Sequence, residues 1–252
     1  MQLYEISTTR KMILTNGRRT FCTDRYRYIE RLRDEFLKRL KNSSLINRRR
    51  YLVYKNSTVG RDNAVLIPLV DNSEHFSILF TQRSFLLKNY GGQICFPGGK
   101  IERGELPLEA ALRETKEEIG LDARTIKIYG TMPPIYNKKL QSRIYPVVGQ
   151  LGNIENLRER ELSYEVQTIF TVQIDELCEK FQYTYHRDGC FEYVLPKFNV
   201  SNFDIIRTND QYPQKEFCIW GLTAVMLHSF LYYFVPFKYL KKITPPNYDN
   251  FF

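Results

Sequence analysis

The chain has 252 residues, of which 43% are hydrophobic and 14% are aromatic, so its composition excludes an intrinsically disordered protein. Its length suits one large domain or two small ones. The formal net charge of +9 favours an anionic ligand, such as a phosphorylated small molecule, and is also compatible with weak RNA binding. We find neither a zinc-finger spacing nor the motif of a known RNA-binding module, so we expect a small-molecule substrate and no nucleic acid partner.

The cysteines and the two ends of the sequence bear on the compartment. Five scattered cysteines without a CxxC pair are typical of reduced thiols in an intracellular protein. Residues 1–22 contain four basic residues and one acidic residue, which resembles a mitochondrial transit peptide, although an ordinary basic tail fits equally well. The last three residues do not form the peroxisomal address Ser-Lys-Leu. We expect mitochondria, with the cytosol as the alternative, and we place one folded domain at residues 23–237, between tails at 1–22 and 238–252.

In chain order, the first expected elements are a helix and a hairpin. An apolar stripe at helical spacing predicts a helix over residues 24–41. Residues 64–70 and 76–81 are apolar, β-rich runs separated by the turn sequence Asp-Asn-Ser-Glu, so they predict a hairpin. Pro68 has no backbone N–H to donate, which places the first strand at a sheet edge or at a bulge. A short strand is expected at residues 94–96.

A helix is predicted next, over residues 107–119. Pro107 suits its first position, and Gly120 suits the residue just past its end. An apolar stripe along this helix is expected to face the core. Its members are Leu108, Ala111, Leu112, Thr115 and Ile119.

Three glutamates of this helix lie off that stripe. Glu114, Glu117 and Glu118 are spaced i, i+3, i+4, which puts their carboxylates on one side of a helix, where they repel one another. A hard divalent cation such as Mg²⁺ would remove the repulsion, since it binds carboxylate oxygens together with substrate phosphates. A solvated acidic face is the alternative interpretation of the same three residues.

The rest of the chain predicts more strands and two helices, which together favour a single α/β domain. Strands are expected at residues 125–129, 144–150 and 167–172, a loop at 131–142, a short helix at 174–180, a hairpin at 182–195, a polar surface insertion at 199–215, and a last helix at 217–234. The apolar run 217–237 is long enough to span a bilayer. It contains Gly, His and Ser and ends near a proline, so we expect a core helix and no membrane span.

The residues around the acidic helix resemble the signature box of the Nudix hydrolases. The matching positions are Gly99, Glu105, Arg113, Glu114, Glu117, Glu118, Gly120 and Leu121, and Thr115 departs from the usual aliphatic residue. The resemblance implies an α/β Nudix fold, with a mixed sheet sandwiched between helices, and a metal-dependent hydrolysis of a diphosphate bond with Mg²⁺ or Mn²⁺. A catalytically silent Nudix-like binding protein is the alternative from another class.

The resemblance also implies roles for particular residues. Metal ligands are expected at Glu114, Glu117 and Glu118 and at the carbonyl of Gly99, while Glu105 would hold the start of the helix and reach the metal through water. Arg113 is expected to orient the carboxylates. The general base is left open between a glutamate of the box and Glu165, which precedes a predicted strand.

A second resemblance concerns the substrate. Residues 79–84, Lys88 and residues 91–99 are similar to the upstream motif of the coenzyme A diphosphatases within the family, and residues 219–224 are similar to their C-terminal helix. Lys88 replaces a customary arginine, and Tyr90 stands where a histidine is common. The implied substrate is coenzyme A or an acyl-CoA, cut to 3′,5′-ADP and 4′-phosphopantetheine or its acyl form. The alternative is another nucleoside diphosphate derivative, such as NADH, ADP-ribose or a dinucleotide.

Four cations are candidates for binding the extra phosphate of such a substrate. They are Arg83, Lys88, Lys100 and Arg103. A generally basic surface would explain the same four residues. The sequence leaves the oligomeric state open.

Overall fold

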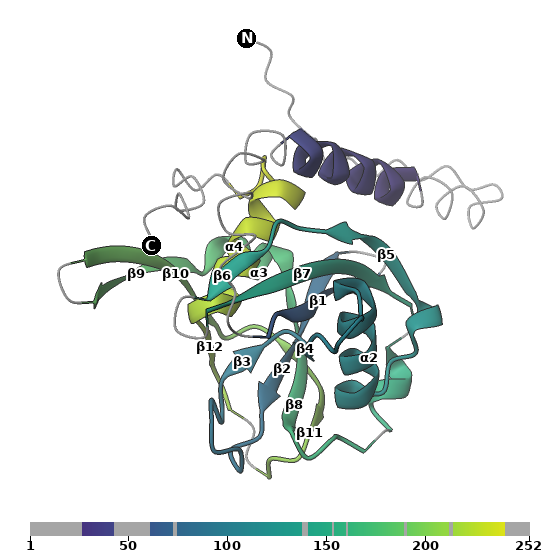
Figure 1. Ribbon diagram of the computed structural model, residues 1–252, viewed down its shortest axis with the longest axis vertical. Helices are drawn as coiled ribbons and strands as arrows, with labels where there is room; N and C mark the ends of the chain where they lie inside the picture. Colours follow the sequence, from purple (N-terminus) through teal and green to yellow (C-terminus); the bar gives the residue numbers. More distant parts are fainter. Residues whose placement is uncertain are drawn as a thin grey trace, which may run out of the picture.

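The computed structural model describes most of the chain from residue 27 to residue 239 (Figure 1). The described ranges are 27–42, 61–72, 75–137, 141–152, 154–159, 161–188, 191–211 and 214–239, and the backbone alone is described at residues 186–188 and 191–193. The predicted tail at 1–22 lies outside these ranges, as does most of the predicted tail at 238–252.

A mixed nine-stranded sheet forms the centre of the molecule. Its main path runs β11-β8-β2-β1-β7-β5, with β3 on β2, β4 on β1 and β6 on β7. The bounds are β1 Asn63–Asp71, β2 Phe76–Arg83, β3 Ile94–Cys95, β4 Gly98–Lys100, β5 Ile126–Thr131, β6 Ile135–Asn137, β7 Ser142–Leu151, β8 Val166–Gln173 and β11 Asp204–Thr208. β1 and β7 are parallel, whereas the other pairs are antiparallel.

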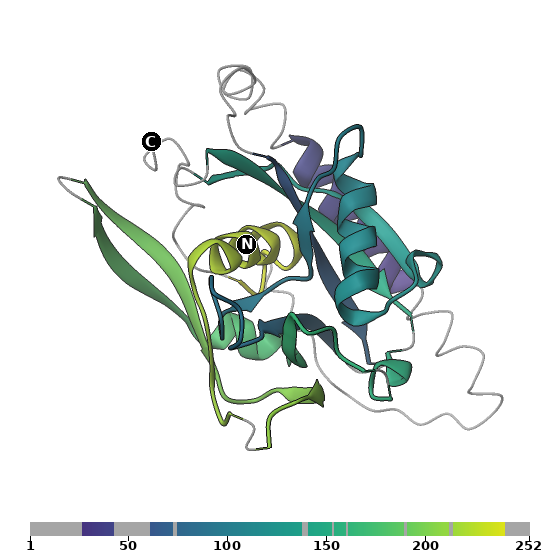
Figure 2. The same cartoon turned by 60° about the horizontal axis from the view of Figure 1, so that its bottom comes forward.

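Helices cover both faces of this sheet, which confirms the single α/β domain that the Nudix resemblance implies. Helix α2, Pro107–Ile119, packs on β1, β4, β7 and β8. Helix α4, Gly221–Phe234, and the helix of residues 27–42 share the hydrophobic cluster on the other face. Figure 2 shows α2 and α4 on opposite sides of the sheet. Each face is closed by a separate hydrophobic cluster.

A second sheet of three strands stands beside α4. It has the order β12-β10-β9, with bounds Phe217–Ile219, Phe191–Val200 and Phe181–Asp188, and the short helix α3, Ile174–Glu179, leads into it. The predicted hairpin is confirmed as β9 and β10, and it projects from the body of the molecule in Figure 1.

The prediction for Pro68 was wrong, because β1 is a central strand. On one side β1 pairs with β7 throughout, including Pro68 with Gly149. On the other side β1 pairs with β4 at residues 63–65 and with β2 at residues 69–71. The backbone N–H of Leu66 points to this second side, where it donates to the Pro97 carbonyl. Because N–H groups alternate along a strand, Pro68 points to the same side, between the two ladders, where no N–H is needed.

Three further segments differ from their predictions. The loop predicted at 131–142 contains β6, because Ile135 is buried against the core and the strand pairs with β7. The polar insertion predicted at 199–215 contains β11, which buries Ile206 and extends the sheet beside β8. The last predicted helix begins later than expected, at Gly221, since residues 217–219 pair with β10 as β12.

The remaining predicted elements are confirmed with small shifts of their ends. The 27–42 helix buries Phe36 against Phe230 and Phe234 of α4, and Arg39 Nη1 donates to the Tyr233 carbonyl at 2.9 Å near the end of α4. Tyr239 is also buried, with its hydroxyl 2.7 Å from His228 Nδ1. Among the described residues, no helix combines the length and the apolar character needed to cross a membrane.

Candidate active site

Local signals set the ends of helix α2, which carries the acidic residues. Pro107 occupies the first turn, and the Glu109 carboxylate accepts a hydrogen bond from the Leu106 N–H at 2.9 Å. Gly120 closes the helix in the left-handed region with φ of 74° and donates to the Lys116 carbonyl. Helix α2 therefore spans the range predicted from the sequence, residues 107–119. The direction of each acidic side chain follows from its position along the helix.

The Arg113 guanidinium links three carboxylates at one end of the site. It donates from Nε and Nη2 to the two oxygens of Glu105, at 2.9 and 3.1 Å, which is a bidentate contact. Its Nη1 donates to Glu114 at 3.0 Å and to Glu117 at 3.4 Å. Its Nη2 also reaches the Lys100 carbonyl at 3.0 Å. Hydrogen bonds from Arg113 and from the Glu102 N–H hold the pKa of Glu105 below its usual range.

Glu118 differs from the other two glutamates of the cluster because it is buried, with 8% of its surface exposed. The sequence placed it off the apolar stripe, and that was wrong. The inner face of α2 also includes Ala110 and Glu118, since Glu118 follows Ala111 by two turns. Its Oε2 accepts a hydrogen bond from the Gly98 N–H at 3.2 Å. Burial, reinforced by the charge of Glu114, raises the pKa of Glu118 to about 8.

Two glycines of β4 allow the backbone to approach these carboxylates closely. A Cβ on Gly99 would lie 2.5 Å from the carboxyl carbon of Glu114. A Cβ on Gly98 would lie 2.3 Å from the Ala64 carbonyl oxygen, and Gly98 has φ of 152°. Any side chain here would displace Glu114 or the strand pairing, so the site needs glycine at both positions.

A second corner of the site joins residues from two distant segments. Arg83, at the end of β2, has Nη2 3.9 Å from Glu165 Oε2, and the Tyr164 hydroxyl donates to Glu165 Oε1 at 2.9 Å. The Ser84 N–H donates to the Glu165 carbonyl at 2.7 Å, which ties the backbones together. Arg83 and Glu165 both act electrostatically on Glu118. The structure thus brings Arg83 and Glu165, which are far apart in the sequence, beside the acidic helix.

Sequence reasoning missed two neighbours of this corner. Cys95 Sγ lies 3.2 Å from Thr81 Oγ1, and burial, followed by the charge of Glu118, raises the pKa of the Cys95 thiol to about 11. Tyr164 holds Glu165, as described above. No local signal in the sequence identifies Cys95 or Tyr164 as a neighbour of the site.

The four predicted phosphate-binding cations lie at the ends of two strands and in the loops that follow them. Arg83 ends β2 and Lys88 lies in the loop after it, whereas Lys100 ends β4 and Arg103 lies between β4 and α2. Lys88, Lys100 and Arg103 are exposed, and Arg83 is half-buried. Of these four cations, Arg83 is the one that contacts Glu165.

The carboxylates suit a hard cation by their chemistry. In the part of the chain that the structure describes, no three His, Cys, Asp or Glu side chains are grouped closely enough to hold a metal ion. Glu105, Glu114 and Glu117 turn toward Arg113, and Glu118 turns toward the Gly98 N–H. Burial, followed by the charge of Glu114, raises the pKa of Glu118, and a divalent cation beside the two carboxylates would favour their ionised forms. The donor set therefore fits Mg²⁺ or Mn²⁺ once the side chains turn to it.

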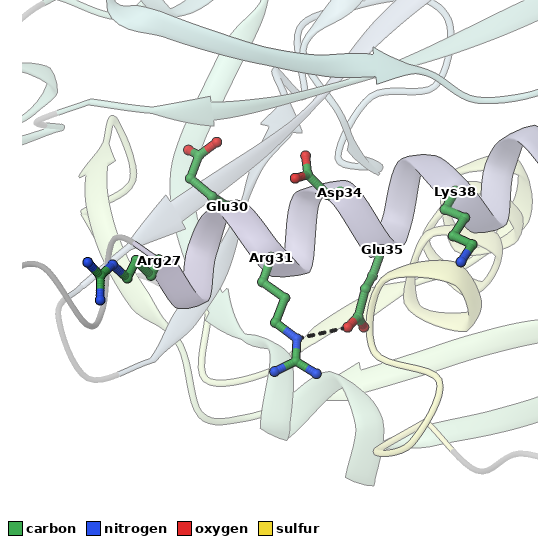
Figure 3. Close-up of a pocket in the computed structure, with 6 residues that line it drawn as sticks. All are labelled: Arg27, Glu30, Arg31, Asp34, Glu35 and Lys38. Atoms are coloured by element: carbon green, nitrogen blue, oxygen red, sulfur yellow. Dashed lines mark hydrogen bonds and ion pairs between the residues drawn. The ribbon is translucent and has the colours of Figure 1, made fainter.

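A hollow of about 440 Å³ lies elsewhere, along the 27–42 helix (Figure 3). Its lining is a set of charged side chains from that one helix, with Arg31 and Glu35 joined in an ion pair. The lining residues are Arg27, Glu30, Arg31, Asp34, Glu35 and Lys38. None of the predicted site residues borders it, so it is not the candidate active site.

Comparison with known proteins matches most of this chain to proteins of one family. The NUDIX domain family profile matches residues 60–193. Nudix hydrolase 3 of Caenorhabditis elegans is 34% identical over 232 residues, covering 90% of this chain and 92% of that protein. A mitochondrial coenzyme A diphosphatase of Mus musculus is 30% identical over 188 residues, covering 73% and 82%.

Likeness to solved structures is weaker. An Ap4A hydrolase of C. elegans is 21% identical, covers 45% of this chain and 81% of that one, and superposes with a TM-score of 0.39. At so low a score, this likeness adds no argument about the substrate.

Proposed function

We propose, from the premise that this chain belongs to the Nudix hydrolase family and hydrolyses a diphosphate bond, that its substrate is coenzyme A or an acyl-CoA. The observation that carries the proposal is the position of Arg83, from the upstream motif, beside Glu165 and close to Glu118. A cation at this point can meet a phosphate group of a substrate whose diphosphate lies at the acidic helix. The relative from Mus musculus, which is a mitochondrial coenzyme A diphosphatase by name, supports the same substrate.

In this proposal the acidic helix holds the divalent metal that members of the family generally use. Glu114, Glu117 and Glu118 and the Gly99 carbonyl would be its ligands, with Glu105 reaching it through water. When bound, the metal lowers the pKa of a coordinated water and neutralises charge that builds on the diphosphate oxygens. Mg²⁺ and Mn²⁺ both suit these oxygen ligands.

The protein's own residues would orient these groups. Arg113 holds Glu105 by two hydrogen bonds and Glu114 by one, which limits the freedom of both carboxylates before substrate binds. This arrangement supports an orienting role for Arg113, because its fork is already occupied by protein acceptors.

Glu165 is our candidate for the general base. Its two oxygens are contacted separately, Oε1 by the Tyr164 hydroxyl and Oε2 by Arg83. A carboxylate placed in this way beside the acidic helix can accept a proton from an attacking water. A glutamate of the box remains the alternative base. Glu165→Gln should lower kcat strongly if Glu165 is the base, whereas an unchanged kcat would assign that role to the acidic helix.

A substrate panel with product identification tests the proposal. It should include CoA, an acyl-CoA, dephospho-CoA, NADH, ADP-ribose and a dinucleoside polyphosphate, each with Mg²⁺ and with Mn²⁺. CoA should have the highest kcat/KM and yield 3′,5′-ADP and 4′-phosphopantetheine, and dephospho-CoA should have a lower kcat/KM. Arg83→Ala should reduce the difference in kcat/KM between CoA and dephospho-CoA. A preference for ADP-ribose or NADH would overturn the substrate. Failure to cleave any of them would favour a silent binding protein.

We also propose a mitochondrial location, supported by the basic composition of residues 1–22 and by the name of the mouse relative. Imaging a C-terminally tagged chain with and without residues 1–22 tests it. Loss of a mitochondrial signal on deletion is the expected result, and a diffuse signal from both chains would favour the cytosol.

A further inference from the structure

Exposed apolar side chains gather beside the Arg83–Glu165 corner. Among the described residues, nine large hydrophobic side chains are exposed, and four of them flank this corner. Three belong to residues 84–92, the loop that joins β2 to β3. The four are Phe85, Leu86, Tyr90 and Tyr164, exposed to 54%, 91%, 51% and 77%. Such a concentration of exposed apolar surface next to a site indicates a binding surface.

Hydrogen bonds at its base keep this loop folded. The Arg83 N–H donates to the Gln93 carbonyl at 2.9 Å, and the Gly92 N–H donates back to the Arg83 carbonyl at 3.0 Å. Inside the loop, the Leu87 and Leu86 N–H groups donate to the carbonyl and the hydroxyl of Ser84, at 3.2 and 3.3 Å. The loop therefore presents its apolar side chains in a defined arrangement and loses little conformational freedom on binding a ligand.

Two backbone features support a built surface. Tyr90 has φ of 60°, a left-handed conformation that costs free energy for a residue with a side chain and that tends to persist at functional sites. The Phe85 ring lies against Gly92, where a Cβ would come within 2.5 Å of it. The close packing at Gly92 fixes the position of the Phe85 ring.

We propose that this apolar loop, together with Tyr164, binds the fatty acyl tail of an acyl-CoA. The inference rests on the function proposed above and adds a preference for acylated over free CoA. The ligand would be an anion with an apolar tail, and the surface has both characters, since Arg83 and Lys88 accompany the apolar side chains. Leu86 lies three residues beyond Arg83, hence within about 11 Å of it along the chain.

A membrane surface is the other apolar ligand to consider, and the loop suits it poorly. Binding to an anionic bilayer draws on clusters of lysine and arginine near the inserted side chains. Residues 84–92 contain one basic residue, Lys88. The position next to the catalytic carboxylates instead favours part of the substrate.

The test compares chain-length preference between variants. CoA, acetyl-CoA and octanoyl-CoA are assayed below micelle-forming concentrations, and the readout is kcat/KM for each acyl-CoA relative to CoA. A fully buried methylene gains about fourfold in binding, so a chain lying on an open surface should gain roughly tenfold between acetyl and octanoyl. Leu86→Ser should lower the octanoyl preference about threefold or more, and Leu86→Phe should retain it. Because Leu86 is almost fully exposed, neither change should affect folding.

Tyr185→Ser is the matched control, since Tyr185 is 83% exposed on the projecting hairpin and should leave the preference unchanged. The inference would be overturned if the unmodified chain showed no preference for octanoyl-CoA, or if Leu86→Ser showed the same preference as the unmodified chain. Cleavage of CoA in the same assays would still support the proposed function. Co-flotation with phosphatidylserine vesicles that depends on Leu86, without a chain-length effect, would assign the loop to a membrane instead. If no CoA compound were cleaved, the proposed function itself would fall.

Discussion

At the scale of single residues, the acidic helix separates three glutamates that look equivalent in the sequence. Glu117 is exposed and contacts Arg113, Glu114 packs on Gly99, and Glu118 is buried against the Gly98 N–H. Their environments differ enough that each substitution should have its own effect on stability, even though all three are proposed as metal ligands.

We expect Glu117→Gln and Glu118→Gln to lower kcat by about 10²-fold or more, because each removes the negative charge of a proposed metal ligand. Steady-state assays over a range of Mg²⁺ concentrations measure the effect, and circular dichroism controls for folding. Full turnover in either variant would mean that the proposed ligand set is wrong.

The same two variants should differ in stability without metal. The pKa of Glu118 is raised from 4.5 to about 8 in the folded chain, so its contribution to the free energy of unfolding is complete below pH 4.5 and is lost as pH rises through 8. Between these pH values the free energy of unfolding should fall by up to about 1.4 kcal/mol per pH unit because of this residue. Glu118→Gln should abolish this fall, whereas Glu117→Gln should retain it. Denaturant unfolding in EDTA at pH 5, 6.5 and 8 measures this, and parallel pH curves for both variants would contradict it.

Arg113→Lys should lower kcat/KM about tenfold, since lysine keeps the charge but cannot hold both oxygens of Glu105 while reaching Glu114. Arg124→Lys is the control, because Arg124 makes a similar paired contact with Asp122 on the exposed surface. Equal activity of the two variants would argue against an orienting role for Arg113.

At the scale of elements, α4 carries a buried histidine that should make stability depend on pH. His228 is fully buried, its Nδ1 lies 2.7 Å from the Tyr239 hydroxyl, and its ring stacks on Phe181. Burial lowers the pKa of His228 from 6.5 to about 4. The neutral ring is therefore favoured in the folded chain, and the unfolded chain binds an additional proton at acidic pH.

Stability should consequently fall as pH decreases from 6.5 toward 4, by up to about 1.4 kcal/mol per pH unit from this residue. His228→Phe preserves the aromatic stack and should flatten that part of the curve, while His75→Gln, at a half-buried histidine outside α4, serves as a control. Urea unfolding at pH 4.5, 5.5 and 7 measures the slope. A slope equal to that of the unmodified chain would exclude His228 as its source.

At the scale of the whole molecule, the helix of residues 27–42 lies outside the region matched by the NUDIX profile, residues 60–193, yet it is part of the core. Phe36 is fully buried, with its ring 5.8 Å from Phe230 and 5.7 Å from Phe234. This contact closes the sheet face opposite α2, so the stability of the site depends on it indirectly.

Phe36→Ala should destabilise the fold by about 3–5 kcal/mol, because it removes a buried ring and leaves a cavity. Phe237→Ala is the control, since Phe237 is exposed, and it should cost far less. Thermal unfolding of both variants measures the difference. Similar melting temperatures would show that the 27–42 helix contributes little to the core.

The sequence by itself determined the acidic helix, the first hairpin and most of the strands, because their signals are local. Pro107 and Gly120 mark the ends of α2, and the turn after Asp71 separates two apolar runs. It also determined the identity of the box residues, since their spacing is read directly along one helix.

Only the tertiary structure decided which of these residues meet. The burial of Glu118 depends on how α2 is rotated against β1 and β4, and no spacing in the sequence specifies that rotation. The pairing of β6 with β7 and of β11 with β8 gives order to polar segments whose own pattern predicts a loop. The contact between Arg83 and Glu165 forms because β2 and β8 are neighbours in the sheet, and strand order follows from the packing of the whole chain, not from any local pattern.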